Sequence, residues 1–298
     1  MKKNTIKLSG LLIFAFFCLQ GCMADLRTEL VKKEGITVQN ATKGRAILER
    51  AWKAQGFDNI ENHQVYSFTG KDTWKGMFGR IGKVWPNKES ELKFKYQVGT
   101  FDGQVAFLDG KRRGELAGLQ NWNYYEVDNK NNVSFKNNNK RIVFGLAAFQ
   151  YFTEMVGRLR NAPIISYAGE KELRGKQYDL VFVTWHTEKP HKEADQYIAW
   201  INKETGIMDF AQYTIRENYL RAPGGKSICG GVEFSDFRTI DGVQIAHEQT
   251  VYTFKLRKKK KKNLHQLIIS DFEFDGFDVE ELRLDKNIEL GGNFKTLK

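Results

Sequence analysis

Between residues 63 and 274, apolar side chains recur at every second position, and this period limits the possible folds more than any other feature. From Leu92 to Val98, for example, apolar residues alternate with lysine and glutamine, which predicts a strand with one buried and one hydrated face. Similar strands are predicted at residues 104–108, 122–127, 178–186, 196–201, 208–216, 232–237, 243–256 and 265–274. Turn residues separate them at 109–110, 204–206, 241–242 and 275–276. So many sequential strands with short turns predict an antiparallel meander.

One long apolar segment interrupts the strand pattern. After an Asn- and Lys-rich loop at residues 128–140, residues 141–160 carry apolar side chains at helical spacing over an unusually broad face. The sequence Asn161-Ala162-Pro163 is expected to end this helix, because the residue before a proline disfavours helical backbone. A helix this apolar has to be covered on most sides, and the neighbouring sheet is the expected cover.

A second, amphipathic helix is predicted before the strands. Asn40 or Thr42 can cap its N-terminus, and Gly56 stands where a left-handed residue commonly ends a helix. Its apolar face comprises Ile47, Leu48, Ala51 and Trp52.

Residues 1–21 have the features of a secretory signal peptide. Three lysines and no acid precede an unbroken apolar run at residues 11–19, which is too short to span a bilayer stably, since a spanning helix needs roughly 20 apolar residues. The run ends in Leu19-Gln20-Gly21-Cys22, which resembles the bacterial lipobox, whose cysteine is diacylated before cleavage. We therefore predict that Cys22 is the lipidation site. A plain secretory signal with an incidental cysteine is the alternative.

These features divide the chain into a signal peptide (residues 1–21), a lipidated N-terminus and polar tether (residues 22–40) and a single domain (residues 41–298). Two acyl chains on Cys22 would give stable attachment where one chain is marginal. Cys229 then has no partner for an intramolecular disulfide, and we assign it no chemistry.

The chain is basic and rich in aromatic residues. Its formal net charge is +11, and the three lysines of the signal peptide account for part of it, so that +8 remains after cleavage. This balance suits a protein that works near anionic lipid or lipopolysaccharide. A nucleic-acid partner is not expected for an exported lipoprotein.

The order of these elements resembles the LolA/LolB-type outer-membrane lipoprotein-sorting family. The likeness rests on the helix at 46–56, on the hairpin sequence I-N-K-E-T-G-I-M at 201–208, and on V-E-F-S-D-F and I-D-G-V-Q-I-A-H at 232–237 and 240–247. Asn202 and Ala246 replace the more usual acid and proline. The resemblance covers roughly residues 41–275 and implies a mainly β (α+β) fold, a half-open β-barrel around an apolar cavity with helices as a lid. This chain is longer than the minimal carrier and, with Cys22, has the anchor of the membrane-fixed receptor.

Two sets of residues are candidates for binding. The apolar helix would form the lid, and its residues Phe149, Phe152, Met155 and Leu159 could line a cavity for acyl chains. The same side chains could instead simply fill the barrel. The volume of the cavity decides between these alternatives.

The second set is a run of cations between two strands. Arg257 is followed by Lys258, Lys259, Lys260, Lys261 and Lys262. Such a loop could dock on an anionic membrane surface, each cation contributing about 1 kcal/mol near the surface. A solvated loop tip without a partner is the alternative.

Other motifs do not support chemistry. Gly224-Gly225-Lys226-Ser227 lacks the spacing and the strand-to-helix setting of a phosphate-binding loop. His186 and His191 have no evident third metal ligand, and no nucleophile elbow or carboxylate pair stands out. We therefore expect neither catalysis, nor a metal, nor a cofactor.

The sequence thus predicts a lipid-anchored binding protein of the cell envelope, at the outer membrane of a Gram-negative bacterium. Its ligand would be a lipid or the acylated end of another lipoprotein, as in lipoprotein sorting. The alternative is a non-enzymatic scaffold that presents basic loops to a protein or polysaccharide partner.

Overall fold

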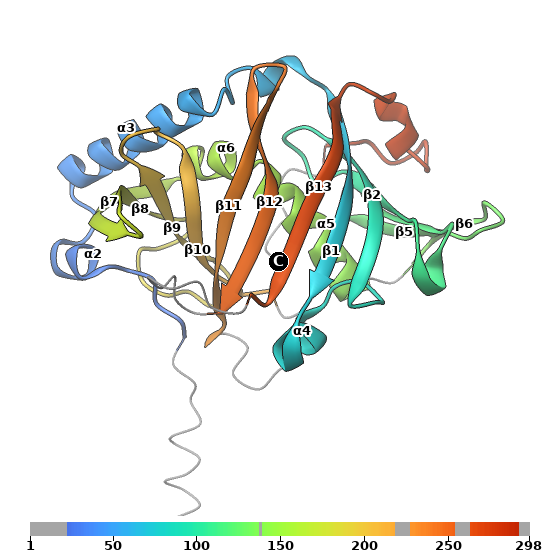
Figure 1. Ribbon diagram of the computed structural model, residues 1–298, viewed down its shortest axis with the longest axis horizontal. Helices are drawn as coiled ribbons and strands as arrows, with labels where there is room; N and C mark the ends of the chain where they lie inside the picture. Colours follow the sequence, from blue (N-terminus) through green and yellow to red (C-terminus); the bar gives the residue numbers. More distant parts are fainter. Residues whose placement is uncertain (1–22, 137–138, 218–226, 254–262, 292–298) are drawn as a thin grey trace, which may run out of the picture.

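A computed structural model describes residues 23–136, 139–217, 227–253 and 263–291 (Figure 1). Its centre is one antiparallel 13-stranded sheet in the order β6-β5-β4-β3-β2-β1-β13-β12-β11-β10-β9-β8-β7. The strands are Val65–Trp74 (β1), Glu89–Gln97 (β2), Gly103–Phe107 (β3), Leu116–Gln120 (β4), Asn123–Val127 (β5), Val133–Phe135 (β6), Ile164–Leu173 (β7), Lys176–Thr184 (β8), Gln196–Asn202 (β9), Met208–Thr214 (β10), Cys229–Ile240 (β11), Val243–Thr253 (β12) and His265–Phe274 (β13). The α-helices are Glu29–Glu34 (α2), Val38–Ala54 (α3), Gly76–Gly82 (α4), Lys140–Thr153 (α5) and Met155–Arg160 (α6), with 3-10 helices at Ile60–Asn62 (η1), Gly110–Arg112 (η2) and Val279–Leu282 (η4). The mainly β, antiparallel prediction is confirmed.

The first and last strands, β1 and β13, are neighbours in the middle of this sheet. Strands β1 to β6 run from the centre to one edge, and β7 to β13 return from the other edge until β13 pairs with β1. In the described part of the chain, β6 and β7 are the open edges, and α5 and α6 are the segment that connects them. The two helices therefore lie across the sheet, as Figure 1 shows behind the strands.

Apolar side chains form three clusters around the sheet. One joins β1 to β5 with α5, a second joins β7 to β12 with α3 and α6, and a third lies on the opposite face of β7 to β10. Every residue of β9 is buried, because this strand is covered on both faces. Val31 of α2 belongs to the third cluster, so the N-terminal segment covers that outer face.

The predicted lid helix is in fact two helices. The segment 141–160 is helical to within a residue at each end. The helical hydrogen-bond pattern is interrupted at Glu154, whose φ of −101° and ψ of 13° lie outside the helical region. The break coincides with a buried glutamate that bonds to the sheet instead of to water. The single-helix prediction is therefore wrong at this residue.

The N-terminal region differs from the sequence-based prediction in two ways. Thr37 caps α3, not Asn40 or Thr42, and the segment predicted as a tether is helical from Glu29, with Val31 only 2% exposed. The prediction of a tether is therefore wrong for these residues. Gly56 has φ +68°, as predicted for the residue that ends the helix.

None of the helices in the described ranges is both long and apolar enough to cross a bilayer.

Candidate functional site

Helices α5 and α6 place the predicted lid residues in two different clusters. Phe149 packs among the aromatic residues of β1 to β5, and its ring lies 5.4 Å from those of Trp85 and Phe94. Met155 and Leu159 belong to the cluster with α3 and β7 to β12 and are almost fully buried. Phe152 is half-buried and packs against the same cluster as Met155 and Leu159, with its ring centroid 5.3 Å from that of Tyr213.

A cavity of about 110 Å³ lies under the C-terminal half of α5. Its walls are mostly aromatic and aliphatic and come from the helix, from β9, β10 and β12, and from the segments around β1 and β13. The lining includes Trp74, Ala148, Phe149, Tyr151, Phe152, Tyr197 and Tyr213. For comparison, an apolar cavity of about 150 Å³ holds one benzene molecule. In this conformation the side chains fill most of the interior, and a long acyl chain does not fit.

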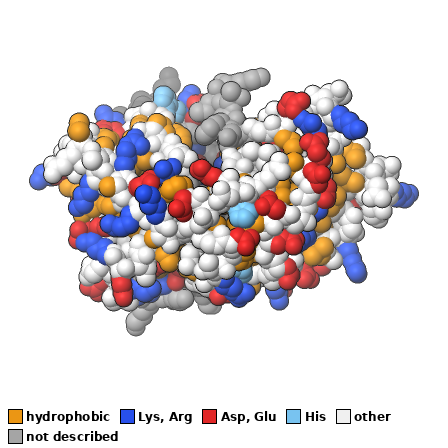
Figure 2. Space-filling model, turned by 90° about the horizontal axis from the view of Figure 1, so that it is seen from above, with side chains coloured by type: hydrophobic (Ala, Val, Ile, Leu, Met, Phe, Trp, Pro, Cys, Tyr) orange, Lys and Arg blue, Asp and Glu red, His pale blue; other side chains and the backbone are white. Residues whose placement is uncertain are grey.

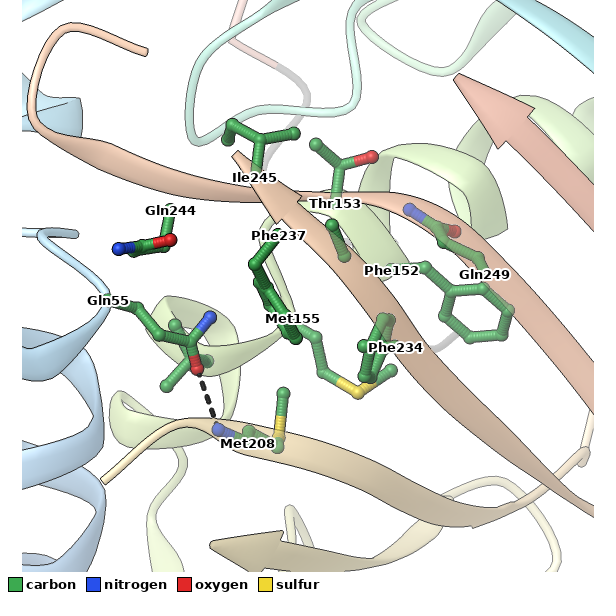
Figure 3. A pocket seen from close by; sticks show the side chains of 12 residues that line it. Gln55, Phe152, Thr153, Met155, Met208, Phe234, Phe237, Gln244, Ile245 and Gln249 are labelled. Atoms are coloured by element: carbon green, nitrogen blue, oxygen red, sulfur yellow. Dashed lines mark hydrogen bonds between the residues drawn. The ribbon is translucent and has the colours of Figure 1, made fainter. Parts of the chain in front are cut away.

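Two more hollows continue along the same helices. A hollow of about 20 Å³ lies beside Phe152 and Met155 (Figure 3), where Met208 N donates a hydrogen bond of 3.0 Å to Gln55 Oε1. A hollow of about 320 Å³ follows at Gly157 and Arg158, lined also by Trp52, Phe57, Ile60, Val98 and Trp185. Phe152 lines both of the first two hollows, and consecutive residues of α6 line the second and third. The three hollows are thus arranged in sequence beneath α5 and α6.

Asp195 brings a carboxylate to the wall of the 110 Å³ cavity, directly before β9. Its Oδ1 accepts hydrogen bonds from Thr214 Oγ1 at 2.8 Å and from the Arg216 amide at 2.9 Å. Burial raises the pKa of Asp195 to about 7, although both hydrogen bonds and the Arg216 charge act in the opposite direction. Near neutral pH the carboxyl is therefore partly protonated, which reduces the cost of keeping it beside apolar walls.

His265 also lines this cavity, and its contacts are structural. Its Nε2 bonds to the carboxylate of the fully buried Asp72, and Trp74 Nε1 donates to the second oxygen of that carboxylate. The imidazole also packs on Trp74, with ring centroids 4.3 Å apart. This buried network, in which each polar group has a partner, fixes the start of β13 against the end of β1.

Glu154 holds the junction of α5 and α6 to the sheet. Its Oε1 accepts from Tyr66 Oη and Gln150 Nε2, both at 3.1 Å, and its Oε2 accepts from the Gly99 amide at 3.2 Å. Arg158 donates to Oε2 at 2.8 Å. Burial, followed by the Glu154 charge, raises the pKa of Tyr66 well above its ordinary value, so the phenol remains a donor. The glutamate therefore ties both helices to the strands.

The remaining predicted residues give no further site. Cys22 and Lys258 to Lys262 lie outside the described residues. His186 and His191 have ring centroids 4.2 Å apart, but no group of three or more potential metal ligands occurs in the described ranges. The sequence analysis missed Asp195, Tyr151 and Tyr197, because nothing in their local pattern distinguishes a cavity wall from a filled core.

Comparisons with known proteins find similarity only among solved structures. No protein-family model matches the chain. No curated protein matches it either.

Among solved structures, a DUF1329 family protein from Desulfovibrio piger has 13% identity and a TM-score of 0.49, covering 82% of this chain and 97% of that one. An outer membrane lipoprotein-sorting protein domain from Vibrio parahaemolyticus has 11% identity and a TM-score of 0.47, with the same coverage. A LolA superfamily protein from Nitrosomonas europaea has 9% identity and a TM-score of 0.46, covering 79% and 94%. Two of the three carry names of the family that the sequence resembles. At these scores the likeness says nothing about the ligand of this chain.

Proposed function

We propose that this protein binds a hydrophobic ligand, a lipid or the acylated end of another lipoprotein, between the sheet and helices α5 and α6. The observation that carries the proposal is the row of three hollows beneath these helices, in which Phe152 borders the first two and Met155 lines the middle one. Both are side chains that rotate without moving the backbone, and methionine adapts readily to irregular apolar ligands. Rotation of Phe152 and Met155 together with an outward shift of α5 would join the hollows into one channel.

Ligand entry would require the two helices to move outward together. They are joined at Glu154, and their attachment to the sheet there depends on a few hydrogen bonds. A ligand that binds the open arrangement better than the closed one shifts the population toward opening, and no cofactor is needed for this. Transfer between a donor and an acceptor would require only that opening be easier near a membrane or partner.

We further propose that the protein acts while fixed to the outer membrane of a Gram-negative bacterium through acylated Cys22, and that it is not an enzyme. Two acyl chains suffice for stable attachment. An anchored binding protein would act as an acceptor or a retained carrier, not as a diffusing shuttle.

The test is ligand binding by the purified protein. We expect native mass spectrometry and lipid extraction to find bound acyl species, and a fluorescent fatty acid to bind with saturation. Ala148→Phe, which fills the 110 Å³ cavity, should reduce that affinity about tenfold or more, since it removes the space for several methylenes. Ala147→Phe is the matched control, because Ala147 is a half-buried neighbour on α5 that lines none of the three hollows. Absence of both bound lipid and fatty-acid affinity would refute the proposal.

A second candidate is a cell-envelope scaffold for a protein or polysaccharide, and the largely filled interior favours it. A scaffold would retain its partner in a pull-down when Phe149→Asp disrupts the lid. A ligand-binding protein would lose lipid in the same variant.

A further inference from the structure

Helix α4 has the reverse of the usual distribution of residues on a surface helix. Its large apolar side chains point into solvent: Met77 is 67% exposed, Phe78 65% and Ile81 47%. Gly79 and Gly82 face the protein instead: both are buried, and a Cβ at Gly79 would lie 3.0 Å from the Trp74 carbonyl carbon. Since soluble proteins rarely gather large exposed apolar residues on one turn, this face indicates an interaction surface.

The segment that contains this apolar face is rich in cations. Lys75, Arg80 and Lys88 are exposed, and residues 75–88 contain no acid. Burial, together with neighbouring cations that include Arg141 and Lys88, lowers the pKa of Lys83. The local potential is therefore positive, and it complements an anionic surface.

The described chain begins at the same end of the sheet. The register pairs Thr214 of β10 with Cys229 of β11, and Trp74 of β1 with His265 of β13, so β10 and β1 end on one side. Just beyond β10, the Arg216 guanidinium donates to the Ala24 carbonyl at 2.6 Å. With four strand spacings between β1 and β10, α4 and Ala24 lie roughly 20 Å apart along this edge. In Figure 1, α4 lies at the bottom of the molecule, where the blue N-terminal segment also begins.

The opposite end has a different surface. Figure 2 shows it from above, with acidic and basic side chains intermixed and apolar groups scattered among them. The combination of an exposed apolar turn and a cation-rich segment is thus not a general property of the molecule.

We propose that α4 is a second membrane contact, which inserts Met77, Phe78 and Ile81 into the interface of an anionic bilayer. Lys75, Arg80 and Lys88 then meet the lipid phosphates. With Ala24 at the same edge, the strands would stand on the membrane and α4 would fix the rotation of the domain. The Arg141 guanidinium, at the start of α5, donates to the Ile81 and Lys83 carbonyls at 2.7 and 2.8 Å, so the lid begins beside the membrane.

The test is vesicle binding by residues 23–298, which lack the acylated cysteine. This fragment retains every residue of the three apolar clusters, and its melting transition confirms the fold before use. We expect it to sediment with vesicles of phosphatidylcholine containing about one third phosphatidylglycerol, and much less with phosphatidylcholine alone. The triple variant Met77→Ser, Phe78→Ser, Ile81→Ser should bind about tenfold or more weakly. Lys75→Gln with Arg80→Gln and Lys88→Gln should remove the preference for phosphatidylglycerol.

The matched control is Val38→Ser with Val133→Ser, which removes exposed apolar side chains elsewhere, at 85% and 47% exposure. This control should bind like the unaltered chain. Equal vesicle binding by the triple serine variant would overturn the proposal. A concentration-dependent dimer in sedimentation velocity that the triple variant abolishes would also overturn it, since the apolar face would then serve a second copy of the chain.

Discussion

Gly56, which follows helix α3, lies so close to the β11–β12 hairpin that a Cβ atom on it would stand 1.9 Å from the Gly242 carbonyl oxygen. Beside this contact, the Gln244 amide donates to the Gln55 carbonyl at 2.8 Å. The end of α3 is thus fixed to a hairpin nearly two hundred residues away in sequence. This contact sets the position of the helix that lines the largest hollow with Trp52.

The first prediction concerns this contact. Gly56→Ala should lower the free energy of unfolding by several kcal/mol, because it adds a backbone clash to the roughly 1–2 kcal/mol cost of a left-handed alanine. Gly175→Ala is the control, since Gly175 has φ +80° and no neighbour within 4 Å of its added Cβ. Urea denaturation of both variants measures the difference. Equal losses in the two variants would show that the hairpin simply moves aside.

The second prediction concerns the junction of the lid. Glu154→Ala should destabilise the protein by about 3–5 kcal/mol, because it leaves the largely buried Arg158 guanidinium and the Tyr66 hydroxyl without their partner. Glu49→Ala removes an exposed carboxylate that bonds Arg160, and it should cost far less, because solvent screens exposed ion pairs. Chemical denaturation gives both values. Hydrogen exchange should also show faster opening of residues 140–160 in Glu154→Ala alone, and unchanged exchange there would contradict a role in holding the lid.

The third prediction concerns pH. Because the pKa of Asp195 is about 7 when folded and near its ordinary value of 3.8 when unfolded, the folded state binds the proton more tightly. This carboxyl therefore favours folding at low pH, and its contribution is lost as pH rises from about 4 to about 7. Asp195→Asn should remove that loss, so the variant should be more stable than the parent at pH 8 and similar at pH 4.

Melting temperatures across this range test the third prediction. Asp236→Asn is a suitable comparison, because the hydrogen bond from Arg238 lowers the pKa of the exposed Asp236. The Asp236→Asn variant should therefore melt at a lower temperature than the parent at neutral pH, which is the opposite of the change expected for Asp195→Asn. An Asp195→Asn variant that is less stable than the parent at pH 8 would mean that the carboxylate is needed for its bonds to Thr214 and Arg216.

The sequence predicted nine of the strands. Alternation identifies those with one hydrated face, such as β2, whereas β9 is buried on both faces and its burial does not alternate. It missed β1, β4, β6 and β7. In β1 and β7, bulges shift the register, between Ser67 and Thr69 and between Tyr167 and Gly169. At a bulge the side-chain period of two is interrupted, so the hydrophobic pattern no longer follows one face. The turn predicted at Asp109-Gly110 begins a 3-10 helix instead.

The candidate site was less predictable than the fold. Helical spacing identified the segment that forms α5 and α6, and Phe149, Phe152 and Met155 line hollows beneath it. Leu159 has the same type of spacing but is fully buried in the core and lines none of the three. Whether an apolar side chain fills space or borders it depends on rotamers and on partners distant in sequence, such as Tyr197 and Tyr213. The periodicity of one segment carries no information about its side-chain rotamers or about its partners in distant segments.

The fourth prediction concerns attachment of the whole chain to the membrane. Cys22→Ser should move most of the protein from the membrane fraction to the soluble fraction, because the bilayer then loses two buried acyl chains, each methylene of which contributes about 0.8 kcal/mol. The remainder should be held by α4 and should be released by high salt, since its cations are screened. Cys229→Ser should stay in the membrane fraction, because Cys229 lies at the start of β11 within the folded domain. A Cys22→Ser variant that remained fully membrane-bound at high salt would show that another segment anchors the protein.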